Sequence, residues 1–265
     1  MTGSVALIGY GAIAQAVCAA AAVDTTLGLR QVLVRAGKTA SVQQSLGQSI
    51  QAIESIDQLR DDTALVIECA GHSAVHQFGS AILAQGIDFA IVSAGALADD
   101  VLHQALADAC VSGNARLQIL AGAIGGIDAM AAAGPALQNV VYTARKPPLS
   151  WSGSPAEQTH DLNQITTATA IFEGTAREAA QRYPKNANVV ATVALAGIGF
   201  DRTVVSLMAD PQARGNSHEI VASGGGYDLR YATKGAALAS NPKTSALTAH
   251  SVIRAIRGQA PGLIV

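Results

Sequence analysis

Residues 5–17 read VALIGYGAIAQAV, an apolar segment that runs into Gly9, Gly11 and Ala14. This is the spacing of the Gly-x-Gly-x-x-Gly turn between a strand and a dinucleotide-binding helix, with alanine in the third position. The first glycine permits a tight turn, the second lets a pyrophosphate approach the backbone, and the third position needs only a small residue. Free N–H groups of a helix that begins near Ala12 would then face the phosphates. An ordinary βα turn would show the same glycines, so the surrounding sequence must decide.

Strand-like and helix-like segments alternate along the first 120 residues. The strand-like segments are short, apolar and bounded by glycine or polar residues, as strands buried on both faces of a parallel sheet are. They are Val5–Gly9, Leu29–Val34, Ala64–Ala70, Asp88–Val92 and Arg116–Leu120. Helix-like segments rich in Ala, Leu and Gln separate them, at 12–19, 39–48, 73–85 and 99–112. This alternation predicts βαβ units, and therefore an α/β fold with a Rossmann-type doubly wound parallel sheet.

The pattern changes with AGAIGGIDAMAAAGPAL (121–137), which combines closely spaced glycines with an alanine-rich helix. Beyond it, β-branched and partly alternating segments lie beside helix-like ones, as in an α+β domain. We therefore expect a dinucleotide-binding domain over 1–121 and a second, α+β domain over 122–241. A C-terminal helix over about 242–265 is expected to pack back on the first domain.

Charge and composition restrict the kinds of partner. The chain of 265 residues has 17 Lys and Arg against 19 Asp and Glu, so no positive field is present to hold a nucleic-acid backbone. No basic segment of a signal peptide and no continuous apolar span of membrane length is present. The three scattered cysteines lack metal-ligand spacing, and no other cluster predicts a metal site. We expect a cytoplasmic protein with a small-molecule substrate, and with no nucleic acid, membrane or metal as partner.

The end of the second expected strand bears on the choice between NAD and NADP. An acidic side chain there would bind the ribose 2′-OH of NAD, but the sequence supplies Arg35. A guanidinium favours the 2′-phosphate of NADP, although it can also lie over the adenine ring. At the end of a later strand, Ala70, Gly71 and His72 leave room for ribose and nicotinamide. We expect the domain to accept NADP, without excluding NAD.

His218 is the histidine best placed for acid–base chemistry. It lies in DPQARGNSHEI (210–220), which we expect to be a loop that leads into a strand. An imidazole there can exchange protons near neutral pH, although a structural histidine would fit the same loop. Asn186 and Asn188 precede an apolar helix, where a cap explains one of them and a ligand would explain the other. Since neither a metal motif nor a nucleophile elbow is present, hydride transfer is the chemistry that remains.

Several segments together resemble the L-aspartate dehydrogenase family, and they follow one another along almost the whole chain. They are GYGAIA (9–14), ECAGHSAV (68–75), SAGALAD (93–99), GAIGGIDA (122–129), YTARKPP (142–148), FEGTAREAAQRYPKNANVVATVALAG (172–197), NSHEI (216–220) and NPKTSALTAHSV (241–252). The longer segments are far more specific than a glycine turn. Nothing in composition or periodicity alone points to aspartate.

The resemblance implies an NAD(P)-dependent oxidation of L-aspartate to iminoaspartate. Iminoaspartate then hydrolyses to oxaloacetate and ammonia, or passes to quinolinate synthesis in NAD biosynthesis. The matching positions make His218 the catalytic residue and place Ala123 and Asn188 at the dinucleotide. The family also implies a nucleotide domain followed by a catalytic and dimerising domain, so we expect a homodimer or homotetramer.

The glycine turn, the strand ends and the resemblance together give the residues expected at NAD or NADP. They are Gly9, Gly11, Ala12, Ile13, Arg35, Ala70, Gly71, His72, Ala123 and Asn188. The two carboxylates of L-aspartate also require cations and hydrogen-bond donors. The candidates are Lys185, Lys243 and the Arg145–Lys146 pair, with Asn186 or Thr244 as donors.

Two other functions fit parts of the pattern. An imine reductase of the dihydrodipicolinate reductase type also joins a nucleotide domain to an α+β domain with a basic, histidine-bearing loop. A non-catalytic redox sensor would bind NAD(P)H and transmit its occupancy to a partner. The sensor gives no reason for the combination of His218 with Asn188.

Overall fold

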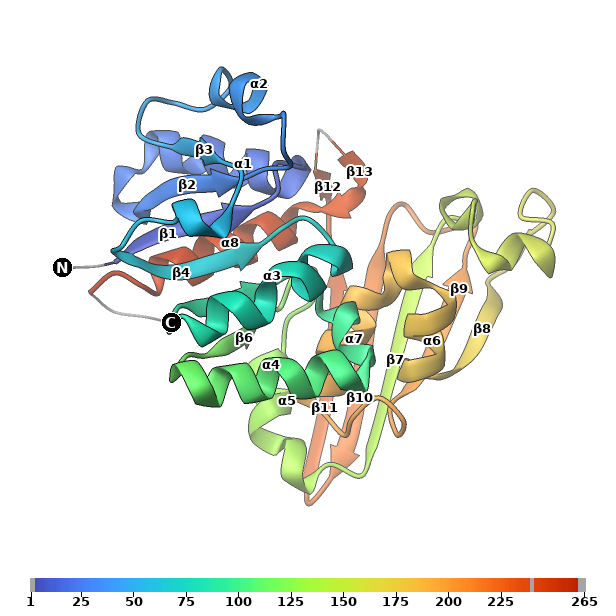
Figure 1. The fold of residues 1–265 in the computed structure, drawn as a ribbon. Helices are drawn as coiled ribbons and strands as arrows, with labels where there is room; N and C mark the ends of the chain where they lie inside the picture. The colour runs from blue at the N-terminus through green and yellow to red at the C-terminus, as the bar shows by residue number, and fades with distance from the viewer. Residues whose placement is uncertain (1–2, 239–240, 262–265) are drawn as a thin grey trace. The chain divides into compact units, whose positions relative to one another are not determined.

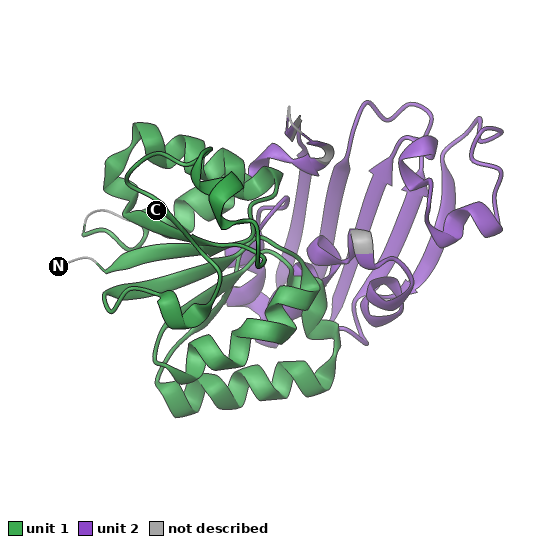
Figure 2. Ribbon diagram, turned by 45° about the horizontal axis from the view of Figure 1, so that its top comes forward, with its two compact units in different colours: residues 1–120, 248–265 green, residues 121–247 purple. Residues whose placement is uncertain are grey.

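A computed structural model describes residues 3–238 and 241–261 of the chain. The chain forms two compact units, which Figure 2 shows in different colours. Unit 1 comprises residues 1–120 and 248–265, and unit 2 comprises residues 121–247. No helix in the described part of the chain is long and apolar enough to cross a membrane.

A six-stranded parallel sheet forms the centre of unit 1, with the order β3-β2-β1-β4-β5-β6. Its strands are β1 (Ser4–Ile8), β2 (Leu29–Leu33), β3 (Gln51–Ile53), β4 (Thr63–Glu68), β5 (Asp88–Ile91) and β6 (Leu117–Ile119). The strand order reverses at β1. Strands β2 and β3 extend the sheet on one side of β1, and the chain then crosses over so that β4, β5 and β6 extend it on the other side. The five expected strands are all present. The sixth, β3, is a short edge strand whose first residue is exposed, and it leaves little apolar pattern in the sequence.

Helices connect these strands and cover the sheet. They are α1 (Ala12–Val23), α2 (Thr39–Gln43), α3 (His72–Ala84) and α4 (Asp100–Gly113), with short 3-10 turns η1 (Thr25–Leu27), η2 (Ile56–Gln58) and η3 (Ala94–Ala98). Helices α3 and α4 pack side by side next to β5 and β6 (Figure 1). Asp99 caps α4 by accepting hydrogen bonds from two backbone N–H groups, whereas α1 begins without a side-chain cap.

Within the described residues, the C-terminal helix is shorter than the expected 242–265, of which residues 262–265 lie outside the described part of the chain. Helix α8 spans Ala246–Arg257, and the residues before it form β13 (Asn241–Ser245), which pairs with β12 (Ala237–Leu238). Because proline disfavours a helical conformation of the residue before it, the segment enters as a strand and turns helical only after Ser245. The Ser245 hydroxyl accepts a hydrogen bond from a backbone N–H in the first turn of α8.

Unit 2 contains a mixed five-stranded sheet with the order β11-β10-β7-β9-β8. Its strands are β7 (Asn139–Lys146), β8 (Thr169–Thr175), β9 (Val204–Ala209), β10 (Ser217–Gly224) and β11 (Tyr227–Lys234). Strands β7 and β9 run parallel, and every other neighbouring pair is antiparallel. Its helices are α5 (Ile127–Ala133), α6 (Ala176–Arg182) and α7 (Ala187–Ala196), with 3-10 turns η4 (Gly134–Ala136), η5 (Pro148–Trp151), η6 (Pro155–Gln158) and η7 (Pro184–Asn186).

The two faces of this sheet differ in burial. Helices α6 and α7 lie against one face, through β8, β9 and β7 (Figure 1). Alternate side chains of the central strands are buried on that covered face; they are Val140, Tyr142 and Ala144 on β7, Val205, Leu207 and Ala209 on β9, and His218, Ile220 and Ala222 on β10. The residues between them point to the open face. The covered face therefore holds both the core of unit 2 and His218.

Candidate active site

The glycine turn of unit 1 has the geometry that its sequence requires. Gly9 adopts a φ of +91°, and its N–H donates to the Leu33 carbonyl oxygen at 2.8 Å. A Cβ at this position would lie 2.7 Å from the Cβ of Ala70. Only glycine fits there, since a side chain would suffer both an unfavourable φ and a clash. The turn thereby brings the ends of β1 and β4 close together.

The N-terminus of α1 is open to an anion. A Cβ added to the N-cap residue Gly11 would meet no atom within 4 Å, and the first turn carries no acidic residue. The first backbone bond of the helix runs from Gln15 N to the Gly11 carbonyl oxygen at 2.9 Å, so the preceding N–H groups of Ala12 and Ile13 are available. Free amides at the positive end of a helix suit a pyrophosphate. These residues therefore fit a dinucleotide.

Glu68 ties together the two loops that follow β4 and β5. Its carboxylate accepts hydrogen bonds from Ala70 N and Gly71 N, both at 2.6 Å, and from the N–H and hydroxyl of Ser93 at 3.1 and 3.0 Å. Burial raises the pKa of Glu68 above the ordinary value, while these hydrogen bonds act in the opposite direction. The carboxylate fixes the backbone of Ala70 and Gly71, and His72 begins α3 directly after them.

Arg35 is exposed just beyond β2, and no carboxylate in the described part of the chain pairs with it. The nearby acidic residue Glu54 is already used: it accepts hydrogen bonds from Gly37 N at 3.0 Å and from the Thr39 hydroxyl, and these lower its pKa. The guanidinium therefore has no carboxylate partner among the described residues, and its contact with the adenosine end of a dinucleotide stays a prediction.

His218 lies in strand β10 and not in a loop, which corrects the prediction. It is the second residue of the strand, and only 8% of its surface is exposed. Strand β10 hydrogen-bonds to β7 on one side and to β11 on the other. This pairing includes Ser217, so the polar start of the segment also forms part of the strand. Alternation then turns the imidazole to the covered face.

Tyr142 holds one nitrogen of the His218 ring. Its hydroxyl lies 2.7 Å from His218 Nδ1, and the two rings are stacked with centroids 6.0 Å apart and planes at 17°. Burial raises the pKa of Tyr142 well above the ordinary value, so the phenol is neutral and can donate or accept in this bond. The bond leaves His218 Nε2 as the nitrogen available for proton exchange.

The imidazole of His218 is neutral at physiological pH. Burial, and to a smaller extent the positive charge of Lys146, together lower the pKa of His218 to about 4. A neutral imidazole can accept a proton from a substrate or a water. Lys146 and His218 are thus electrostatically coupled on the same face of the sheet.

Lys146 and its neighbour Arg145 point to opposite faces. Lys146 shares the face of Tyr142 by alternation; its Nζ donates to Asn186 Oδ1 and lies 4.8 Å from the centroid of the Trp151 ring. Burial lowers the pKa of Lys146 to about 8. Arg145 lies on the open face, 3.9 Å from a carboxylate oxygen of Asp210. The two cations, equivalent in the sequence, are separated by the pleat.

Thr233 completes the surroundings of His218 on the β11 side. It pairs directly with His218 across β10 and β11. Its buried hydroxyl finds no hydrogen-bond partner among the residues that the structure describes. A buried hydroxyl without a partner is unusual, and it indicates a group that meets a ligand or water.

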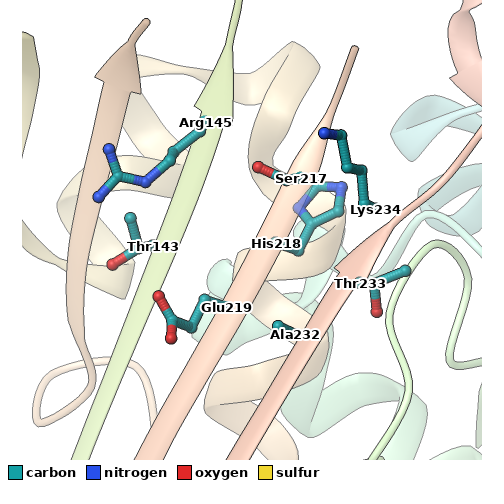
Figure 3. A pocket seen from close by; sticks show the side chains of 8 residues that line it. All are labelled: Thr143, Arg145, Ser217, His218, Glu219, Ala232, Thr233 and Lys234. Carbon is teal, nitrogen blue, oxygen red and sulfur yellow. The ribbon is translucent and has the colours of Figure 1, made fainter. Parts of the chain in front are cut away.

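The opposite face carries a small hollow of about 210 Å³, which Figure 3 shows. Thr143, Arg145, Ser217 and Glu219 line it and alternate along β7 and β10 with the buried side chains. The hollow therefore opens on the face turned away from α6 and α7. His218 and Thr233 also border this hollow, whereas Tyr142 and Lys146 do not.

The remaining predicted residues lie in unit 2. Asn188 is in the first turn of α7, Ala123 lies in the segment before α5, and Thr244 lies in β13. The side chains of Lys185 and Lys243 lie outside the described part of the chain. The structure brings Asn186 to Lys146, but no hydrogen bond between described residues joins Thr244 to that pair.

Three members of the site were not singled out from the sequence. They are Tyr142, Trp151 and Thr233, each of which approaches the cluster from a different element. Only the spacing of positions 142, 144 and 146 on one strand carries a local signal. The other contacts depend on strand register, which the sequence alone does not give.

Comparisons with known proteins show the family to which the chain belongs. The family model of the aspartate dehydrogenase C-terminal domain matches residues 127–259, and that of the homoserine dehydrogenase NAD-binding domain matches residues 9–119. An L-aspartate dehydrogenase of Ruegeria pomeroyi is 47% identical over 96% of this chain and 91% of its own length. Another, from Pseudomonas aeruginosa, is 43% identical over 99% of both chains. The chain belongs to the L-aspartate dehydrogenase family. The resemblance stated from its sequence segments is thereby confirmed.

The solved structures agree on the fold. A crystal structure of aspartate dehydrogenase from Thermotoga maritima superposes with a TM-score of 0.77, at 25% identity and with all of both chains covered. This confirms the expected α/β class, with a Rossmann-type parallel sheet in one unit and a mixed sheet in the other. Like the rest of the L-aspartate dehydrogenase family, the chain is an oxidoreductase, and its first unit is an NAD(P)-binding domain.

Proposed function

We propose that this chain catalyses the NAD(P)-dependent oxidative deamination of L-aspartate to oxaloacetate and ammonia, with iminoaspartate as the intermediate product. Family membership supports the substrate. The observation that carries the chemistry is the neutral imidazole of His218, whose Nδ1 is engaged by Tyr142 while Nε2 is left for proton exchange. The oxidised nicotinamide, when bound, accepts the hydride that leaves Cα of aspartate.

His218 prepares the substrate for that transfer. The amine must be neutral before hydride leaves Cα, and Nε2 takes the proton that the ammonium gives up. A base with a pKa of about 4 would be weak, but the two carboxylates of the substrate bring negative charge toward Lys146 and the imidazole. Negative charge raises the pKa of an imidazole, so substrate binding itself makes His218 a stronger base.

The same nitrogen serves the hydrolysis. His218 first releases to solvent the proton that it took from the substrate ammonium. Water then adds to the imine carbon of iminoaspartate, and His218 accepts a proton from that water and passes it to the carbinolamine nitrogen. Ammonia leaves as the hydroxyl proton is lost, which gives oxaloacetate. In sum, L-aspartate, water and the oxidised cofactor give oxaloacetate, ammonium, the reduced cofactor and one proton. Released iminoaspartate, if it is trapped first, would supply quinolinate synthesis, and we place both routes in the cytoplasm.

Replacement of His218 tests the proposal. In His218→Ala we expect kcat with L-aspartate to fall on the order of 10²-fold or more, with nearly unchanged cofactor affinity, because only the proton-transfer group is lost. The assay follows the absorbance of the reduced nicotinamide, in both directions and with each cofactor. His103→Ala, on helix α4, is the matched control. Unchanged turnover in His218→Ala would remove this residue from the mechanism, and no activity of the native chain on aspartate would overturn the function.

For the cofactor we propose NAD or NADP. The residues of unit 1 proposed to hold it are Gly9, Gly11, Ala12, Ile13, Arg35, Ala70, Gly71 and His72, and the family resemblance adds Ala123 and Asn188 of unit 2. Unit 1 with its C-terminal segment would be the dinucleotide-binding domain. Unit 2 would be the catalytic and oligomerisation domain.

The open face of the unit 2 sheet is our proposed homodimer interface. Val204, Val141 and Val221 lie side by side across β9, β7 and β10, and they are 50%, 38% and 44% exposed. A flat row of exposed apolar residues in mid-sheet can pair with its own copy about a two-fold axis. Light scattering should find a dimer for the native chain and a monomer for Val141→Lys. A native monomer would refute the interface.

A further inference from the structure

Lys146 is a partly buried cation that no described carboxylate neutralises. Its ammonium has three N–H donors, of which one reaches Asn186 Oδ1, and it lies over the face of Trp151. No acidic residue in the described part of the chain lies within ion-pair distance of it. A desolvated ammonium without a counter-ion costs stability, so a fold keeps one where a ligand provides the charge.

The groups around Lys146 also have unused capacity. The amide of Asn186 accepts from Lys146 through Oδ1, and its Nδ2 can donate in turn. His218, which responds to the charge of Lys146, has its Nε2 available. The Thr233 hydroxyl beside His218 has no partner among described residues. These groups are donors and proton acceptors without an anion among them.

The elements packed around Lys146 contribute polar and aromatic side chains but no second charge among the described residues. Strand β7 contributes Tyr142, η5 contributes Trp151, η7 contributes Asn186, and β10 contributes His218, all of which are neutral at physiological pH. The cation is thus the one fixed charge of this cluster among the described residues. An anionic ligand would be the complement of such a cluster.

We propose that Lys146, with Asn186 held against it, binds one carboxylate of the dicarboxylic substrate. The inference rests on the proposed function and assigns a residue to it. Binding replaces an uncompensated charge by a charge-assisted hydrogen bond, and it leaves His218 beside the bound molecule. Lys146 would therefore set the preference for dicarboxylates, whereas Arg145, on the other face, would not contribute.

The structure supplies its own reporter, because Trp151 is the chain's only tryptophan and Lys146 lies against its ring. The holoenzyme with oxidised cofactor is titrated with succinate, a dicarboxylate without an amine that cannot be oxidised in this reaction. Trp151 fluorescence should change on binding. In Lys146→Met we expect the apparent Kd for succinate to rise about tenfold or more, the range measured when one charged partner is lost.

The matched control is Lys234→Met, the same substitution on the open face of the same sheet. It should leave the succinate titration unchanged. Lys146→Arg keeps the charge and should keep most of the affinity. Lys146→Met should also raise KM for L-aspartate more than it changes kcat, whereas Lys146→Arg should change KM little.

The pH dependence gives an independent readout. Burial lowers the pKa of Lys146 to about 8, so in the native chain succinate affinity should fall as the pH rises through about 8 and the ammonium loses its proton. Lys146→Met should show no such fall, and Lys146→Arg should move it beyond the measured range. Methionine removes an uncompensated charge, so thermal unfolding of Lys146→Met should not occur at a lower temperature than that of the native chain.

Each result decides the matter separately from the proposed function. If the native chain oxidises aspartate but Lys146→Met binds succinate as tightly as the native chain, the inference is overturned and the function stands. If no aspartate is oxidised, yet succinate alters Trp151 fluorescence and Lys146→Met abolishes this, the function fails and the dicarboxylate site stands. An equal loss in Lys234→Met would also refute the assignment, because it would show a general effect of charge.

Discussion

Each unit holds a wholly or partly buried ionisable side chain at the end of a strand, and the hydrogen bonds of these two side chains are satisfied to different degrees. In unit 1, Glu68 ends β4 fully buried, and Ala70, Gly71 and Ser93 all donate to its oxygens. In unit 2, Lys146 ends β7 with an amide oxygen and an aromatic face as its partners. The carboxylate of Glu68 has all its hydrogen-bond partners within the protein, whereas the ammonium of Lys146 has N–H donors without a partner among the described residues.

This difference separates a structural charge from a binding charge. A buried ion whose hydrogen bonds are all made inside the fold positions the backbone that donates them. A buried ion with unused hydrogen-bond donors can bind a ligand, and without the ligand it lowers the free energy of unfolding. Neutralising Glu68 should therefore weaken the fold, and neutralising Lys146 should weaken binding.

Glu68→Gln should break the structural half of the comparison, with the largest effect. In the native chain Ala70 N and Gly71 N donate to Oε1 of Glu68, and Ser93 N donates to Oε2. If the oxygen of the new glutamine amide takes the place of Oε1, its NH₂ group takes the place of Oε2 and faces the N–H of Ser93. One buried donor then meets another, which costs about 1–3 kcal/mol in the free energy of unfolding. Thermal and denaturant unfolding measure this loss, and cofactor affinity should fall with it.

Glu54→Gln is the control for that prediction. Glu54 also accepts a backbone N–H, from Gly37, but it does so at the surface. Water can replace its bonds, so its loss should be clearly smaller. Equal stability of Glu68→Gln and the native chain would mean that the buried carboxylate is not what holds the two loops.

Tyr142→Phe sharpens the binding half. The variant keeps the packed ring and removes the hydroxyl at His218 Nδ1, so Tyr142 is tested as a positioning residue. Loss of one hydrogen bond of about 1 kcal/mol predicts a roughly fivefold fall in kcat. The cationic imidazole also loses an acceptor for Nδ1–H, so the pKa of His218 should fall further below its usual range.

The pH profile of kcat distinguishes this role from mere packing. Its acidic limb should move to lower pH in Tyr142→Phe, with cofactor affinity unchanged. Tyr183→Phe is a matched control, because that buried hydroxyl bonds to the Ile171 carbonyl instead. An unshifted profile together with native kcat would show that the phenol does not position the imidazole.

The sequence predicts most of unit 1 because its strands are buried on both faces and leave continuous apolar runs. The short edge strand β3 escapes, since three residues are too few for a pattern. In unit 2 the strands and the helices are predicted, but their register is not. His218 was expected in a loop because GNS (215–217) reads as a turn, yet pairing on both sides makes this segment a strand.

The candidate site shows the same limit more sharply. Family resemblance points to His218, and residue type points to Arg145 and Lys146 alike. Only the pleat of β7, which sends neighbouring side chains to opposite faces, separates those two cations. The contacts of Lys146 with Trp151 and of His218 with Tyr142 join positions whose approach depends on tertiary packing, for which one sequence holds no signal.

Arg35→Ala carries the comparison to the surface and should have the smallest effect. Like Lys146, Arg35 has no carboxylate partner among described residues, but it is exposed, so water and salt weaken whatever it binds. We expect KM for NADP to rise roughly three- to tenfold while that for NAD hardly changes, because only NADP brings a 2′-phosphate. Arg30→Ala, within β2, is the matched control.

The difference between the KM changes for NADP and for NAD should shrink as salt is added, whereas the succinate affinity set by the partly buried Lys146 should respond less. Equal changes in KM for both cofactors would place the guanidinium over the adenine ring, which NAD and NADP share.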